Sequence, residues 1–261
     1  SSGPGIMGTT SAGSWIRCAR MKIILSPSKT QKRDVQGPVD PGALLNQEKT
    51  MALFARLQGM SMEELGAALS VEGSLAEETY RLYQEHGPGN PGLSALACYE
   101  GRAFQALEES CPSPLGKDRG EEHLLILSAM YGLVTPGTMI WPYRLDFKAR
   151  LPFSLYAYWK EEVEGYFREE DLVVNLASEE FSRLLSRPML QLRFLDRGRD
   201  GSLKVISALA KEARGWMAGA ILEEGAFTRE AIRDLHPGGY AYREDLSSGD
   251  EWVYVREKGT P

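Results

Sequence analysis

Residues 127–147 read LSAMYGLVTPGTMIWPYRLDF and join a buried strand to a long polar loop. The apolar strand begins near residue 123 and breaks at Tyr131-Gly132. Beyond the break the segment contains two prolines and ends in aromatic and charged side chains. In an open α/β sheet, ligands bind at the carboxyl ends of the strands. We therefore predict that Ser128 and Tyr131, at the end of this strand, form one wall of a binding cleft.

Two other apolar strands end in polar residues in the same way. Residues 21–25 (MKIIL) run into Ser26, Ser28 and Lys29, and residues 171–176 (DLVVNL) run into Asn175 and Ser178-Glu179. Because the carboxyl ends of parallel strands meet at one edge of a sheet, we expect these groups to converge on the cleft.

Segments in which apolar side chains recur with helical periodicity lie between the strands. The predicted helices cover residues 43–57, 61–69, 74–85, 103–108, 155–167, 178–185, 208–223 and 228–235. Two hairpins are predicted, one from residues 189–196 and 202–206 and one from residues 239–246 and 251–256. Residues 93–99 are expected to be a strand and residues 110–122 a surface loop. This alternation predicts an α/β (mixed α+β) fold, with one compact domain at residues 21–257 and a central mixed sheet surrounded by helices.

Composition excludes several classes of protein. The chain has 261 residues and a net charge of −6, so a protein that is basic throughout is excluded and any nucleic-acid surface must be local. Three cysteines without a CxxC pattern predict neither disulfides nor zinc and fit a cytoplasmic protein. No apolar run approaches the roughly 20 residues of a membrane span. Residues 1–20 are expected to be a disordered leader or an expression remnant.

Searches for common catalytic and cofactor motifs find none. The three histidines are scattered and neither GxGxxG nor GxSxG occurs, so no metal site and no cofactor is predicted. Candidate site residues are instead the polar groups at strand ends, with Tyr143-Arg144 and two cations of one helix, Lys211 and Arg214. Cations, hydroxyls and aromatic rings suit a phosphate or a nucleobase. Ordinary solvated or buried positions are the alternative for each of them.

The turn at Gln58-Gly59-Met60-Ser61 joins two predicted helices, and Ser61 to Glu64 has the pattern of a capping box. A tight turn between helices can direct backbone N–H groups at a phosphate, as in a helix-hairpin-helix element. An ordinary helical hairpin is the alternative.

Several of these motifs together resemble one family. LSPSKT, LSAMYGLVTPGTMIWPYRLDF, VVNLASEEF, GSLKVISALAKEARGWM and GGYAYREDLSSGDEWVYVRE occur in this order, and the combination is similar to the YaaA family of bacterial peroxide-stress proteins. The resemblance implies a cytoplasmic protein with a cannonball fold, a helix-hairpin-helix element and a basic cleft that binds duplex or bubble DNA. It also implies protection against oxidative DNA damage and a lowered level of free iron.

Two functional hypotheses follow. In the first, the protein binds DNA without chemistry of its own. The DNA- or ligand-binding residues would be Ser26, Gly59, Ser128, Tyr131, Tyr143, Arg144, Asn175, Ser178 and Arg214. In the second, the same cleft modifies a nucleobase or nucleotide. Lys29 or Lys211 would then act as nucleophile or base and Glu179 would transfer a proton.

Overall fold

The computed structural model describes residues 20–39 and 43–257, and its core is a mixed sheet. The strand order is β4-β3-β1-β6-β7-β10-β9, with β8 paired to β7. The strands are β1 (Met21–Leu25), β3 (Leu124–Ser128), β4 (Gly132–Val134), β6 (Leu172–Leu176), β7 (Leu190–Arg197), β8 (Leu203–Lys204), β9 (Ala241–Tyr242) and β10 (Glu251–Arg256). A separate antiparallel pair joins β2 (Leu93–Ser94) to β5 (Met139–Ile140).

The central strands are parallel and are buried on both faces. Every residue of β1 and β3 is buried, and near-continuous apolar strands of this kind are typical of parallel sheets covered by helices. β1 pairs in parallel with β3 on one side and with β6 on the other. The edge strands β4, β8 and β9 run antiparallel to their neighbours.

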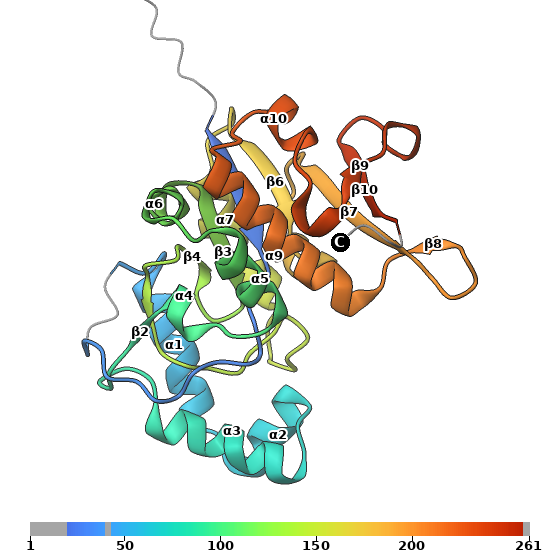
Figure 1. Ribbon diagram of the computed structural model, residues 1–261. Coiled ribbons are helices and arrows are strands. Elements are labelled where there is room, and N and C mark those ends of the chain that lie inside the picture. The colour runs from blue at the N-terminus through green and yellow to red at the C-terminus, as the bar shows by residue number, and fades with distance from the viewer. Residues whose placement is uncertain (1–19, 40–42, 258–261) are drawn as a thin grey trace, which may run out of the picture.

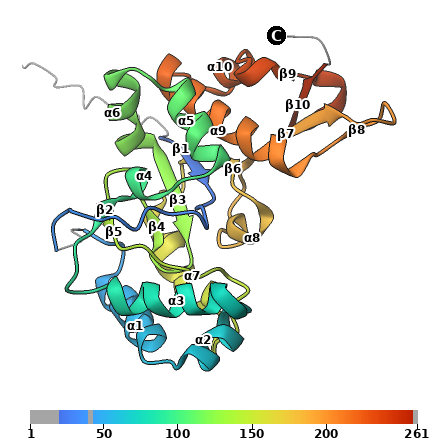
Figure 2. The same ribbon diagram turned by 60° about the horizontal axis from the view of Figure 1, so that its bottom comes forward.

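Helices cover both faces of the sheet. In Figure 1, α9 (Ser207–Glu224) lies in front of the sheet beside α5 (Arg102–Ser110) and α6 (Pro114–His123), and α7 (Leu155–Tyr166) lies behind it. Figure 2 shows α1 (Gln47–Gln58), α2 (Met62–Leu69) and α3 (Gly73–Glu85) grouped at the end of the molecule away from β9 and β10. The remaining helices are α4 (Ala95–Cys98), α8 (Glu179–Ser182), α10 (Arg229–Arg233), η1 (Pro237–Gly239) and η2 (Glu244–Leu246).

The helical group is attached to the sheet by aromatic packing. Phe54 of α1 is fully buried, and its ring centroid lies 6.1 Å from Tyr83, 6.1 Å from Tyr131 and 5.4 Å from Trp141. These contacts are mostly edge-on, the geometry that aromatic quadrupoles favour. Trp141 is fully buried here, so its ring is part of the core and is not free to stack on a ligand.

The α/β fold with its central mixed sheet is confirmed, as are both predicted hairpins, but two local predictions are wrong. Residues 93–99 form only a two-residue strand before α4, because Ser94 accepts a hydrogen bond from the Ala97 amide and caps a helical turn. Residues 110–122 contain most of a helix, α6, which Ser113 caps and which has Pro114 in its first turn.

Tertiary contacts explain why α6 forms from a polar, glycine-rich sequence. Glu223 of α9 accepts hydrogen bonds from the amide and the hydroxyl of Ser113, at 3.2 and 2.9 Å. A Cβ on Gly116 would lie 2.6 Å from the Glu223 carboxylate and 2.8 Å from Cys111 Sγ. The glycine therefore allows α6 to approach α9 closely, which no local pattern reveals.

The predicted leader, residues 1–20, lies outside the described residues except for Arg20, which contacts Asp171. Within residues 20–39 and 43–257, no helix has the length and apolar character needed to cross a membrane.

Candidate functional site

The sheet topology creates a crevice between the carboxyl ends of β1 and β6. These strands are neighbours with Leu25 beside Leu176. The chain leaves β1 toward β3 on one side, and it leaves β6 toward β7 on the other. Where connections from adjacent parallel strands diverge in this way, the sheet has a topological switch point, which is the usual ligand site of open α/β folds.

A cavity of about 680 Å³ occupies this switch point, within the size range of small-molecule sites. Its apolar walls include Leu25, Val71, Phe104, Leu145 and Phe181. We call it the switch-point cavity. Of the predicted residues it brings together Ser26, Lys29, Tyr143, Arg144, Ser178, Lys211 and Arg214. Segments far apart in the sequence thus contribute to one site, as the polar strand ends suggested.

Three cations in the switch-point cavity have no anionic partner. Lys29 pairs with Asp146 at 3.3 Å, and Arg102 pairs with Glu212 at 2.8 Å. By contrast, the side chains of Arg144, Lys211 and Arg214 make no hydrogen bond or ion pair with any residue in the part of the chain described. Arg214 is half-buried, and this burial lowers the pKa of its guanidinium. A desolvated charge without a counterion favours an anion from outside the chain.

Two serines connect the ends of β1 and β6. The Ser178 amide donates to Ser26 Oγ at 2.8 Å, and Ser26 Oγ donates to Ser178 Oγ at 3.2 Å. Although Ser178 precedes α8, its side chain does not cap that helix. Its own hydroxyl hydrogen is therefore free to be donated within the cavity.

Sequence reasoning missed the amino end of α5 as part of this site. Gly101, Arg102, Ala103 and Phe104 all line the cavity. Gly101 has φ of +110°, and a Cβ on it would lie 2.8 Å from Ser28 Oγ. Only glycine combines this conformation with so close an approach. The Glu100-Gly101-Arg102 run was the available signal, but its position depends on tertiary packing.

Glu180 lines the cavity, and the predicted Glu179 does not. Glu179 is exposed and does not line the cavity. Glu180 lines it together with Glu100 and Asp146. One oxygen of Glu180 lies 3.9 Å from Lys148 Nζ, and the other is buried without a hydrogen-bond partner in the described structure.

The fully buried Ser128 and Tyr131 lie behind the cavity wall. Tyr143 is hydrogen-bonded to Ser128 at 2.8 Å and to Tyr99 at 2.7 Å. Burial raises the pKa of the Tyr143 hydroxyl, so it stays protonated. Tyr131 donates to the Trp141 carbonyl and accepts from the Trp141 amide. In this structure the two residues hold the wall in place.

Two further predicted residues also lie outside the cavity lining. Asn175 donates to Gln191 at 2.6 Å and accepts from the Ala177 amide at 2.9 Å, so it shapes the turn after β6. Gly59 lies in a different hollow of about 900 Å³ beside the α1–α2 turn, together with Arg56 and Arg150.

The α1–α2 turn has the predicted helices and capping box, but its amides bond within the chain. Gly59 N donates to the Ala55 carbonyl at 3.0 Å, and Met60 N donates to the Leu57 carbonyl at 3.3 Å. Ser61 N donates to the Glu64 carboxylate at 2.8 Å. These three amides are not directed at a phosphate, so the helix-hairpin-helix function stays a prediction.

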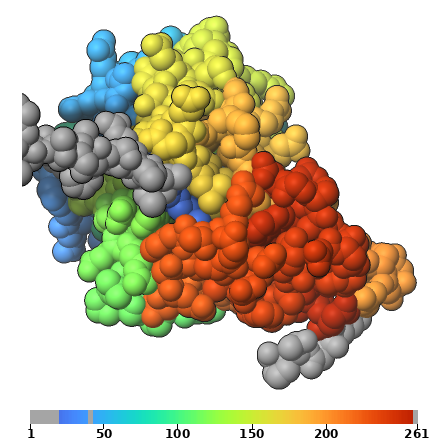
Figure 3. All heavy atoms as spheres, turned by 90° about the horizontal axis from the view of Figure 1, so that it is seen from above, coloured from blue at the N-terminus to red at the C-terminus, as the bar shows by residue number. Residues whose placement is uncertain are grey.

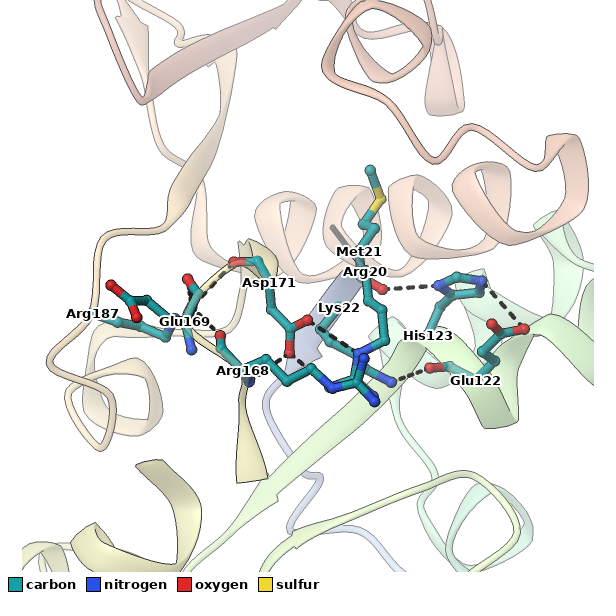
Figure 4. Close-up of polar contacts among 9 residues, drawn as sticks. All are labelled: Arg20, Met21, Lys22, Glu122, His123, Arg168, Glu169, Asp171 and Arg187. Atoms are coloured by element: carbon teal, nitrogen blue, oxygen red, sulfur yellow. Dashed lines mark hydrogen bonds and ion pairs between the residues drawn. The ribbon is translucent and has the colours of Figure 1, made fainter. Parts of the chain in front are cut away.

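A second polar cluster lies at the amino ends of β1 and β6. Figure 3 shows the face on which the green α6, the yellow segment around α7 and the orange-red α9 and α10 surround the blue start of β1. In Figure 4, Arg20 reaches Asp171 with two hydrogen bonds of 3.1 and 2.9 Å, and Lys22 donates to the Glu122 carbonyl. Because this cluster occupies the opposite strand ends, it is separate from the switch-point cavity.

No three His, Cys, Asp or Glu side chains gather as a metal site within residues 20–39 and 43–257.

Comparison with known proteins gives a match over most of the chain. A family model described as peroxide stress protein YaaA matches residues 21–246. A UPF0246 protein of Bordetella avium is 31% identical over 257 residues, covering 90% of this chain and 99% of its own. UPF0246 proteins of Bordetella petrii and Acaryochloris marina are 30% and 28% identical, covering 91% and 90% of this chain and 100% of their own.

Proposed function

The chain belongs to the peroxide stress protein YaaA family, and from this premise we propose that it is a cytoplasmic DNA-binding protein that limits oxidative damage to DNA. The observation that carries the proposal is the set of three unpaired cations, Arg144, Lys211 and Arg214, around the switch-point cavity. Phosphates are the anions that DNA presents, and their neutralisation dominates DNA affinity.

A second basic region supports a path for the DNA backbone. Arg56 and Arg150 line the hollow beside the α1–α2 turn. The hollow and the cavity adjoin through α2, since Ala68 lines the first and Leu69 the second. The loop that bears Arg144 also bears Arg150, whose amide donates to the Ala68 carbonyl at 2.7 Å. A strand of DNA following these arginines would place its phosphates beside Arg56, Arg150 and Arg144.

Titration of a labelled bubble duplex at two salt concentrations tests this proposal. We expect the logarithm of the binding constant to fall linearly with the logarithm of salt, with a slope of about −0.9 for each phosphate neutralised. Lys211→Ala and Arg144→Ala should each reduce the slope by about one. Arg199→Ala, which removes an exposed arginine outside the cavity, should change it little. No binding at low salt would exclude DNA binding.

A nucleotide-modifying enzyme is the second candidate, and the carboxylates favour it. Asp146 and Glu180 line the cavity, and their negative charges would repel the phosphates of a DNA backbone. In this proposal Glu180 moves the proton and Lys29 or Lys211 acts as nucleophile or base.

Mass spectrometry of nucleosides after incubation with bubble DNA measures any product of such an enzyme. Glu180→Gln and Lys29→Ala should abolish the product, and Glu179→Gln should preserve it. An unmodified nucleoside profile with the unaltered protein would exclude the enzyme.

A further inference from the structure

The two ends of the switch-point cavity carry different sets of charged groups. Its cationic end lies on α5 and α9, which supply Arg102, Lys211 and Arg214. The loop after β5 supplies both Arg144 and Asp146, and Glu180 comes from α8. A third carboxylate, Glu100, stands directly before α5. In Figures 1 and 2, α5 and α9 lie side by side, and Figure 2 shows α8 apart from them. A ligand that fits both ends carries an anion on one side and hydrogen-bond donors on the other.

Close packing of α5 on α9 brings the anion-binding groups together. A Cβ on Gly215 would lie 2.0 Å from the Ala103 carbonyl, so Arg214 lies beside the first turn of α5. The first amide to bond within α5 is that of Gln105, to the Gly101 carbonyl at 3.0 Å. No side chain caps the helix. The preceding amides of its first turn add partial positive charge to that of Arg214 and Lys211.

We propose that this cavity binds the terminal phosphate monoester of a single nucleotide. The phosphate contacts Arg214, Lys211 and the first turn of α5, and the base lies between the apolar walls at Phe104 and Leu145. Hydrogen-bond donors of the base or sugar face Glu180. The inference rests on the site of the proposed function and names the unit of nucleic acid that enters it.

A terminal phosphate fits better than the phosphodiester of a continuous strand. A monoester carries about −1.5 to −2 charges near neutral pH because its second pKa is about 6, which suits several cations at once. A diester carries a single charge and continues in both directions. Arg214 is half-buried, so the chain would have to enter and leave past the inner wall. A cavity of about 680 Å³ has room for one nucleotide and not for a duplex.

Calorimetric titration with deoxyadenosine monophosphate, deoxyadenosine and inorganic phosphate tests the chemical class. A parallel titration uses a labelled single strand with either a 5′-phosphate or a 5′-hydroxyl. We expect the monophosphate to bind about tenfold or more tightly than either deoxyadenosine or inorganic phosphate. Preference for the phosphorylated strand identifies a strand end as the source, and binding of the free nucleotide without that preference identifies a metabolite. Both results support the inference.

Variants of the cavity cations test the location of the phosphate. Arg214→Met retains the apolar stem, and Lys211→Met alters an exposed side chain. Each should weaken binding of the monophosphate by about tenfold, and Arg199→Met should leave it unchanged. Thermal melting confirms folding of each variant.

Three results would overturn the inference. They are equal affinity for inorganic phosphate and the monophosphate, no binding of either monophosphate probe, and unchanged affinity in both cavity variants. If bubble DNA still binds and its binding constant still falls with salt, the proposed function stands although the inference fails. Conversely, monophosphate binding without any binding of duplex or bubble DNA would remove the proposed function and retain the inference.

Discussion

Tyr143 shows how one residue serves both the core and the site. Its hydroxyl is bonded to Ser128 and Tyr99 inside the core, but the residue also lines the switch-point cavity. The adjacent Arg144 is fixed through its backbone, since its carbonyl accepts from the Tyr83 hydroxyl and its amide donates to it. The core thus positions the backbone of Arg144, whose side chain is one of the unpaired cations of the site. Rigid support of this kind preorganises a binding group.

Tyr131→Phe tests whether Tyr131 is structural. The change leaves the Trp141 amide and carbonyl without the hydroxyl that bonds both of them. Unpaired buried groups of this kind cost roughly 1–3 kcal/mol of stability. Urea unfolding should show this loss, and Tyr80→Phe at a more exposed position should show little change. DNA affinity of the folded Tyr131→Phe protein should be unaltered. A selective loss of affinity would instead place Tyr131 in the site.

Asp171 should make stability depend on pH. Burial raises the pKa of this carboxyl, but hydrogen bonds from Arg20 and the Arg168 amide outweigh burial and lower it below its ordinary value. A depressed pKa in the folded state contributes stability above the unfolded pKa, about 3.9, and this contribution is lost as the pH falls through the folded pKa.

Asp171→Asn should therefore lose roughly 1–3 kcal/mol at neutral pH and depend less on pH in that acidic window. Urea unfolding at pH 7 and at successive values below pH 4 measures both effects. The exposed Glu169→Gln, from the same cluster (Figure 4), serves as the control. Parallel pH curves for Asp171→Asn and the unaltered protein would contradict the assignment.

At the level of elements, the contact between α5 and α9 defines the cationic end of the site. Gly215 and Gly219 of α9 face α5, where added Cβ atoms would lie 2.0 Å from the Ala103 carbonyl and 1.9 Å from Ser110 Oγ. Small residues at this spacing let the two helix backbones approach closely. The same approach brings Arg214 to the first turn of α5.

Gly215→Ala should separate these helices. The new methyl group meets backbone that cannot move alone, so overpacking should cost roughly 1–3 kcal/mol and weaken nucleotide binding. Gly165→Ala is a matched control in α7, because a Cβ there has no neighbour within 4 Å. It should stabilise the protein by about 0.5–1 kcal/mol. Thermal unfolding and calorimetric titration measure the two effects, and equal responses of the two variants would count against the packing argument.

At the level of the whole molecule, one sheet joins the first strand to the last. β1 is central, and β10 lies in the same sheet after β6 and β7. We therefore predict a single unfolding transition for residues 21–257. Far-UV circular dichroism and tryptophan fluorescence should give the same urea midpoint, since Trp159 lies near β4 and Trp252 lies in β10. Two separate midpoints would indicate two independently folding units.

The sequence alone determined the central strands, most of the helices and the family. Buried apolar runs and helical periodicity are local patterns, and the polar residues after β1 and β6 converge because parallel strands end at one edge. Local patterns could not distinguish Glu180 from Glu179 or predict α6. Both depend on contacts between segments distant in sequence, such as Glu223 with Ser113. Only the tertiary structure decided which cations lack partners, because pairing is a property of the distances between elements. It separated the paired Lys29 from the unpaired Arg214, and it assigned Ser128 and Tyr131 to the core behind the site.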